Sequence, residues 1–145
     1  ALVQRLRDAG IGEASNYAFW LDPWSSEGQL MARQVLPAAS DVRILAESAL
    51  VLVARARRAG PLRHLDAVAA MELGARRIDW LAAKFQFANE IAGMYARAAA
   101  ADTTRAGRRD ATDQLAGITH INGRVQDMRE GFANLKQLYR RAWLS

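Results

Sequence analysis

Apolar and polar residues alternate most regularly near the C-terminal end of the chain. Between Leu115 and Leu144, apolar residues recur at intervals of three and four, and polar or charged residues separate them. This period is typical of an amphipathic helix that buries one stripe. It predicts a last helix over residues 112–144, capped by Asp110 or Thr112. The stripe comprises Ile118, Ile121, Val125, Met128, Phe132, Leu135, Tyr139 and Ala142. If the Phe132 ring is in the core, Phe132→Ala should cost about 3–5 kcal/mol.

A kinked helix is predicted over residues 27–59. Ser25 or Ser26 can cap it, and Gly60-Pro61 ends it. Pro37 lies inside the pattern and predicts a kink, because its ring removes a backbone donor. The apolar seam runs through Val42, Leu45, Ala49, Leu52 and Ala56.

Residues 62–101 predict the central long helix. No proline follows Pro61, and apolar residues repeat with helical spacing in two phases, so two faces should be buried. The first phase includes Leu62, Leu65, Leu73, Trp80, Lys84 and Phe87, and the second includes Met71, Ala75, Ile78, Ala82 and Phe85. A straight helix of this length would extend about 60 Å. Residues 102–111 read as a polar linker.

Residues 1–26 predict a short helix over 1–9 and then an aromatic loop. Four aromatic residues surround Asp22-Pro23, namely Tyr17, Phe19, Trp20 and Trp24. They can cover one end of a helical bundle, or form a surface for carbohydrate stacking or for docking a neighbouring domain. The fold class is therefore all-α: an antiparallel bundle of three long helices with a kinked N-terminal helical segment and an aromatic-rich loop, in a single domain over 1–145. The start without Met and the abrupt end RRAWLS indicate a fragment of a longer chain.

Composition excludes several classes of function. The chain has no cysteine, so it has no disulfide or thiolate metal site, and its two histidines lie far apart. No apolar run approaches the ~20 residues of a membrane span. The net charge of +5 comes from dispersed arginines, which leaves nucleic-acid binding as the less favoured interpretation. We expect no cofactor. The lack of cysteine and of a signal-peptide pattern favours the cytoplasm.

The predicted central helix also carries a polar stripe. Glu72 and Asp79 are seven residues apart, about 10 Å along one face, and Arg76 lies between them. This spacing favours an interhelical salt-bridge network over a catalytic carboxylate pair. Nucleophile, phosphate-loop and zinc motifs are absent from the sequence, so no catalytic, metal or cofactor-binding residue is assigned. The candidate interface residues are Tyr17, Phe19, Trp20, Trp24, Glu72, Arg76, Asp79, Gln86, Asn89 and Glu90.

Three stretches resemble the helical region that follows the catalytic barrel in bacterial members of glycoside hydrolase family 20, the β-N-acetylhexosaminidases. They are YAFWLDPWSSEGQ (17–29), MELGARRIDWLAAKFQFANEIAGMY (71–95) and INGRVQDMREGFANLKQLYRRAWLS (121–145). Enzymes of that family hydrolyse terminal N-acetylhexosamine with the substrate's acetamido group as nucleophile and an Asp-Glu pair in the barrel. This sequence lacks the His-x-Gly-Gly-Asp-Glu-type motif, so no catalytic residue carries over.

The resemblance implies a non-catalytic C-terminal accessory domain that packs on the barrel of its parent chain or mediates dimerisation. By itself the chain would not be an enzyme, whereas its parent would be a glycoside hydrolase. The alternatives are a stand-alone helical protein–protein interaction module and, less favoured, a basic helical domain that binds nucleic acid. A nucleic-acid binder should lose affinity steeply as salt rises.

Overall fold

The computed structural model describes residues 15–61 and 63–143, in which every regular element is a helix. The all-α class is therefore confirmed for this part of the chain. The short helix predicted over residues 1–9 lies outside the described residues. The helices are α2 (Ser15–Trp20), α3 (Ser26–Ala59), α4 (Leu65–Ala100), α5 (Arg105–Thr119) and α6 (Arg124–Trp143).

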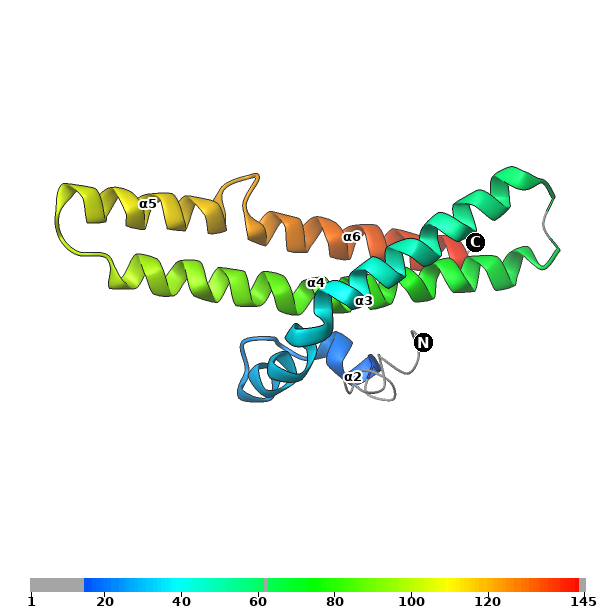
Figure 1. The fold of residues 1–145 in the computed structure, drawn as a ribbon, viewed down its shortest axis with the longest axis horizontal. Coiled ribbons are helices and arrows are strands. Elements are labelled where there is room, and N and C mark those ends of the chain that lie inside the picture. Colours follow the sequence, from blue (N-terminus) through cyan, green and yellow to red (C-terminus); the bar gives the residue numbers. More distant parts are fainter. Residues whose placement is uncertain (1–14, 62, 144–145) are drawn as a thin grey trace.

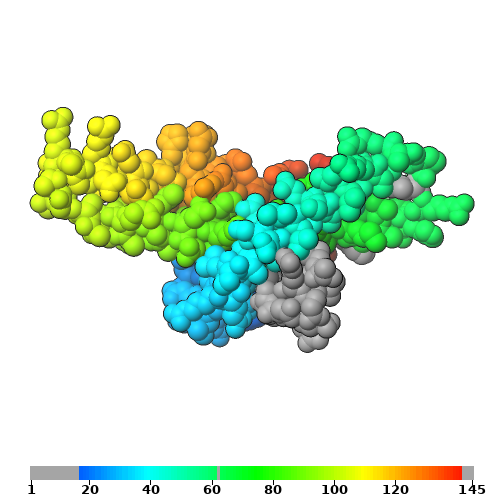
Figure 2. All heavy atoms as spheres, in the orientation of Figure 1, coloured from blue at the N-terminus to red at the C-terminus, as the bar shows by residue number. Residues whose placement is uncertain are grey.

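Helix α4 is the long rod against which the other helices pack. Helix α3 crosses one side of it, and α5 and α6 follow one another back along another side (Figure 1). In the space-filling view, the outer part of the α4–α5 hairpin extends beyond α3 (Figure 2). Residues in the described helices do not combine the length and apolarity that a membrane span requires.

Two apolar clusters hold α4 from its two sides. The cluster beneath α3 contains Ala18, Val35, Ala39, Val42, Leu81, Ala82 and Phe85. The cluster beneath α6 contains Leu73, Trp80, Ala83 and Leu135, with Phe19, Phe87, Met128 and Leu138 packed against it. Burial of α4 from two sides is what its two apolar phases predict. Alanines in the first cluster allow the backbones of α3 and α4 to approach closely, and Phe85 fills the space between them with no exposed surface.

Local capping explains where the helices begin and end. The Ser25 hydroxyl accepts a hydrogen bond from the Gly28 N–H at 3.0 Å, which caps α3 as predicted. Gly60, with a φ of 146°, ends α3 in a conformation that favours glycine. Pro37 lies within α3 without ending it, and the first turns of α3 are set at an angle to the rest (Figure 1).

The prediction of a single last helix over residues 112–144 is wrong, because the structure has two separate helices there, α5 and α6. The chain turns at residues 120–123, where the Gly123 N–H donates to the His120 carbonyl at 2.7 Å. The predicted linker over 102–111 is also too long. Thr104 caps α5 by accepting from the Gly107 N–H at 3.1 Å, so only residues 101–104 connect α4 to α5. The apolar period continues across the turn and conceals the break.

The predicted stripe of the last helix is only partly buried. Ile118 and Leu135 are buried, whereas Ile121 is 75% exposed and Tyr139 is 52% exposed. In α3, Leu52 of the predicted seam is also exposed, and Ala46 is buried instead. On α3 the buried face instead runs through Val35, Ala39, Val42 and Ala46, where alanines allow a close approach to α4. The aromatic passage also differs from a simple loop, because Tyr17, Phe19 and Trp20 belong to α2.

Candidate interaction groove

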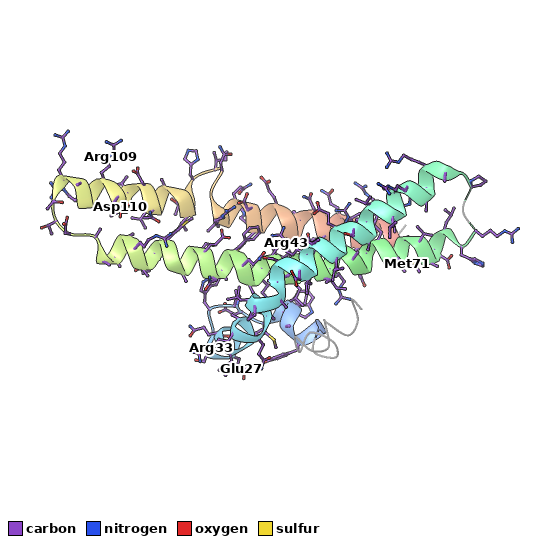
Figure 3. All side chains as sticks on the ribbon, viewed as in Figure 1. Glu27, Arg33, Arg43, Met71, Arg109 and Asp110 are labelled. Atoms are coloured by element: carbon purple, nitrogen blue, oxygen red, sulfur yellow. The ribbon has the colours of Figure 1, made fainter. Side chains whose placement is uncertain are left out.

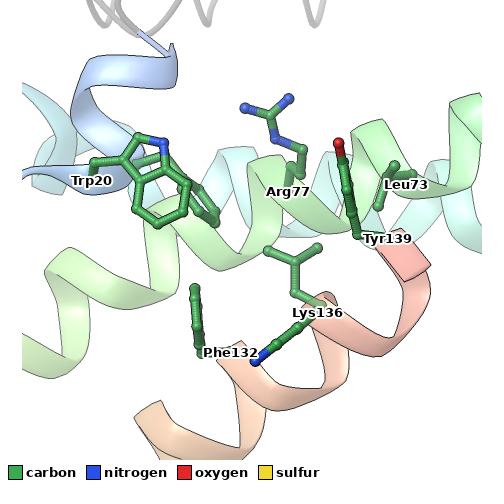
Figure 4. A pocket seen from close by; sticks show the side chains of 8 residues that line it. Trp20, Leu73, Arg77, Phe132, Lys136 and Tyr139 are labelled. Atoms are coloured by element: carbon green, nitrogen blue, oxygen red, sulfur yellow. The ribbon is translucent and has the colours of Figure 1, made fainter. Parts of the chain in front are cut away.

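A groove of about 570 Å³ lies where α2, α4 and α6 meet. Its volume is within the range of small-molecule and side-chain pockets. Figure 4 shows the Trp20 ring at one end, Tyr139 at the other and Phe132 on the α6 wall. The lining residues are Phe19 and Trp20 from α2, Leu73 and Arg77 from α4, and Phe132, Leu135, Lys136 and Tyr139 from α6. We call this set the aromatic groove.

Lys84 fixes the helix that supplies two of these rings. Its Nζ donates to the carbonyl oxygens of Ala18 and Phe19, both at 3.0 Å, and to that of Leu21. These carbonyls lie at the C-terminal end of α2 and just beyond it. The helix dipole is negative at this end, and the last C=O groups of a helix lack helical partners. Lys84 is only 6% exposed, and this burial lowers its pKa to about 8, although the nearby Asp22 carboxylate acts in the opposite direction.

The sequence pattern does not reveal this role of Lys84. The residue falls in an apolar phase of the central helix, between Ala83 and Phe85, and this placement is the signal in the sequence that its ammonium is buried. A buried ammonium needs acceptors. The acceptors here are backbone carbonyls more than sixty positions away in the chain, which no local pattern identifies.

Aromatic contacts connect the walls of the groove. The centroid of the Phe132 ring lies 6.2 Å from those of Phe19 and Trp80. Phe19 also meets Trp20 edge to face at 5.1 Å, and the Arg77 guanidinium lies 5.6 Å from the Phe19 ring centroid. Such pairs add to the area that they bury. The rings therefore form one continuous surface that passes from the core to solvent.

Both charged side chains among the described lining residues of the aromatic groove are cations. Arg77 and Lys136 project from α4 and α6, and none of the described lining residues carries a carboxylate. Trp20 is 76% exposed, Tyr139 52% and Phe132 39%. The groove therefore presents rings and cations together.

The polar stripe of α4 faces α3. Glu72 accepts from Arg57 at 2.8 Å, with the Arg76 guanidinium 3.7 Å away, and Asp79 pairs with Arg43 at 2.9 Å. Arg43 lies where α3 crosses α4 (Figure 3). The predicted interhelical salt-bridge network is thus confirmed between α3 and α4.

Gln86 extends this network by one more step along α4. Its side-chain oxygen accepts from Arg43 at 3.0 Å, and its Nε2 donates to the Ser40 hydroxyl at 3.2 Å. A second, polar depression of about 360 Å³ lies here, lined by Ser40, Arg43, Ile44, Glu47, Leu50, Arg76, Asp79 and Gln86. Glu72 and Asp79 are therefore each engaged by α3 rather than converging on a shared pocket.

Glu90 faces α6 instead. Its carboxylate lies 2.6 Å from Arg124, which also donates to Asp127 at 3.0 Å. The hydrogen bond to Asp127 and the charge of Glu90 raise the pKa of Arg124. Asn89, the neighbour of Glu90, is exposed on α4.

Two aromatic residues of the candidate interface do not line the groove. The Tyr17 hydroxyl donates to the Glu27 carboxylate, and this hydrogen bond raises the pKa of Tyr17. Trp24 lies in the turn before α3, where its backbone N–H donates to the Asp22 carboxylate at 3.0 Å. Of the ten candidate interface residues, the groove thus brings together Phe19 and Trp20.

No three His, Asp or Glu side chains in the described ranges gather closely enough to hold a metal ion. Comparisons with protein-family models, curated proteins and solved structures find no match to this chain.

Proposed function

We propose that this chain is a non-catalytic helical accessory domain of a β-N-acetylhexosaminidase-like glycoside hydrolase. In this proposal α3, α4 and the consecutive pair α5 and α6 form an antiparallel three-layered bundle. The bundle packs on the catalytic barrel of the parent chain. The aromatic groove is the contact surface. The observation that carries the proposal is the clustering of exposed rings, Trp20, Phe132 and Tyr139, at one groove. Clustered exposed aromatics are typical of interaction sites, whereas isolated ones are common on any surface.

The location of the resemblance supports the same proposal. Residues 17–29, 71–95 and 121–145 are the three stretches that resemble the family, and they contain most of α2, the first turn of α3, part of α4 and all of α6. Each lining residue of the aromatic groove falls within one of them. The similarity therefore concentrates on the elements that would meet the barrel. The acids of α4 contribute to helix–helix ion pairs, as a scaffold requires.

Two measurements test this proposal. The first is the open reading frame around this chain: a preceding barrel with an Asp-Glu motif supports the proposal, and a start codon just before Ala1 contradicts it. The second is turnover of a nitrophenyl N-acetylglucosaminide. We expect no chromophore release by this chain alone, and robust turnover by the purified chain would reject an accessory role.

Binding to the barrel can be measured directly once the two parts are produced separately. Trp20→Ala should weaken their association, because Trp20 is mostly exposed and lines the groove. Tyr95→Ala is the matched control, since Tyr95 is 65% exposed on α4 outside the groove. Equal effects of the two variants would contradict a contact through the groove.

A stand-alone interaction module, forming a homodimer, is the second candidate. Helix α3 exposes Ile44 by 61%, Val51 by 44% and Leu52 by 63%, away from the residues that line the groove. A dimer through α3 would cover this apolar surface. Sedimentation of the wild type and of Leu52→Glu distinguishes the candidates: a dimer that dissociates in the variant favours the module, and a monomer in both rejects it.

A further inference from the structure

We infer that a second copy of this chain docks on the solvent-facing side of α3, antiparallel to the first copy and related to it by a two-fold axis beside Val51. The inference rests on the second candidate function, the interaction module, and adds the orientation and the contacts of its dimer. The aromatic groove is lined by α2, α4 and α6, so it takes no part in this contact.

The C-terminal half of α3 carries apolar surface that a single copy of the chain does not cover. Residues 49–54, ALVLVA, form the longest uninterrupted apolar run in the sequence, and none of them is buried. Ile44, Val51 and Leu52 are all exposed. Figure 2 shows this half of α3 lying uncovered in front of α4. Exposed apolar surface of this kind is typical of a site that a partner covers.

The exposed side of α3 also has the spacing of a helix-pairing seam. Ile44, Ser48, Val51 and Arg55 are all exposed, and they follow one another at intervals of four, three and four residues. Positions with this spacing meet a partner helix in coiled coils. Ser48 is small, and its hydroxyl already donates to the Ile44 carbonyl at 2.8 Å. A second helix can therefore approach closely without leaving this hydroxyl unpaired.

The charges on this side are complementary to themselves in an antiparallel pair. Glu47 precedes Val51 by four residues and Arg55 follows it by four, so each lies about 6 Å from Val51 along the helix. Neither Glu47 nor Arg55 has an ion-pair partner among the described residues. A two-fold axis beside Val51 reverses the chain direction and brings each Glu47 level with Arg55 of the second copy. Two identical ion pairs then flank one apolar contact, as in an isologous interface.

This order of charges selects a second copy as the occupant of the surface. Parallel packing in the same register would place Glu47 against Glu47, and like charges in contact are unfavourable. A different protein would have to supply an acid and a base in the reverse order, whereas a second copy of α3 already carries them. A different protein on α3 is the alternative outcome of the test.

Sedimentation equilibrium of the full chain tests the two ion pairs. Glu47→Arg and Arg55→Glu should each raise the Kd of the dimer about three- to thirtyfold, because each replaces two attractive pairs at an exposed site by repulsive ones. The double variant exchanges both charges and should return the Kd to within about threefold of the wild type. Arg109→Glu is the matched control and should leave the Kd unchanged, because Arg109 is exposed on α5 at the outer end of the molecule (Figure 3).

Val51→Cys tests the position of the axis independently of charge. The chain has no cysteine, so this variant carries a single thiol. Mild oxidation should give a covalent dimer, because a disulfide needs Cβ atoms about 4 Å apart and the axis brings the two copies of position 51 together. Leu115→Cys is the control, since Leu115 is 43% exposed, close to the 44% of Val51, but lies on α5. We expect Val51→Cys to cross-link roughly tenfold faster or more, because the thiols are held together in the dimer.

Three results would overturn the inference: a wild type that stays monomeric at millimolar concentration, charge reversals that the double variant does not rescue, or equal cross-linking of the two cysteine variants. If the second or third result accompanies a dimer that Leu52→Glu dissociates, the interaction module stands and this geometry falls. If the charge rescue and the cross-link occur but the open reading frame starts just before Ala1, the inference stands and the accessory role falls.

Discussion

Gly131 of α6 lies directly against the indole of Trp80 on α4. A Cβ atom at position 131 would come within 2.6 Å of Trp80 Cζ3 and 2.9 Å of Cε3. Real Cβ atoms do not approach so closely, and Trp80 is only 8% exposed, so its ring has little room to move. The glycine allows α6 to approach α4 beside the groove.

Substitution of Gly131 tests the close contact. Gly131→Ala should destabilise the folded chain by about 1–2 kcal/mol. The overpacking against Trp80 is more unfavourable than the gain in helix propensity is favourable. Gly74→Ala in α4 is the matched control: a Cβ there meets no atom within 4 Å, so the variant should gain roughly 0.5–1 kcal/mol. Urea denaturation of both variants gives the comparison. If Gly131→Ala stabilised the chain, the Trp80 ring would have to shift away from position 131 with little loss of packing energy.

Two phenylalanines should differ in their contribution to stability. Phe85→Ala should cost about 3–5 kcal/mol, because Phe85 is fully buried between α3 and α4. Phe132→Ala should cost less, about 1–2 kcal/mol, since its ring is 39% exposed. This value is lower than the cost that the sequence pattern predicts for a core ring. Thermal and urea unfolding measure both, and an equal loss would place Phe132 in the core after all.

The pH dependence of stability should report on Lys84. The pKa of Lys84 falls from 10.5 to about 8 on folding because the ammonium is buried. Between these values the unfolded chain holds the proton more tightly, so deprotonation relieves the burial of charge in the folded state. Stability relative to Lys84→Met should therefore rise with pH, by about 2 kcal/mol between pH 7 and pH 10. Denaturant unfolding of both proteins at pH 7, 8.5 and 10 measures it. A difference independent of pH would contradict the lowered pKa.

The ion pair between Arg43 and Asp79 should contribute little to stability. Both side chains are about 40% exposed, at 40% and 38%, so solvent screens their attraction. A double-mutant cycle of Arg43→Met and Asp79→Asn should give a coupling of about 0.2–1 kcal/mol. A coupling well above this range would mean that the link from Arg43 to Gln86 reinforces the pair.

The helical class and the boundaries of α3 and α4 follow from local patterns. Ser25, Gly60 and Pro61 delimit α3, and the lack of proline after position 61 leaves α4 uninterrupted. The polar stripe of α4 correctly predicts the cross-helix pairs of Glu72 and Asp79. These features depend on spacing within one helix, which is why the sequence is sufficient to predict them.

The turn at residues 120–123 and the aromatic groove depend on contacts between distant segments. Apolar spacing persists through His120 and Gly123, so periodicity alone does not reveal the turn. The groove needs α2 to lie beside α6, which the hydrogen bonds of Lys84 to the end of α2 secure. Burial follows the fit of small residues such as Ala46 rather than the size of an apolar side chain such as Leu52.

The turn at residues 101–104 is the tip of the α4–α5 hairpin, and it lies far from the groove. Arg77 and Ala100 are separated by about 35 Å of continuous helix. Exposed tips of this kind tolerate inserted sequence. A fluorophore, an affinity tag or a fused reporter attached there would leave the rings around Trp20 accessible, which makes the tip a suitable handle for immobilising the chain while partners are screened.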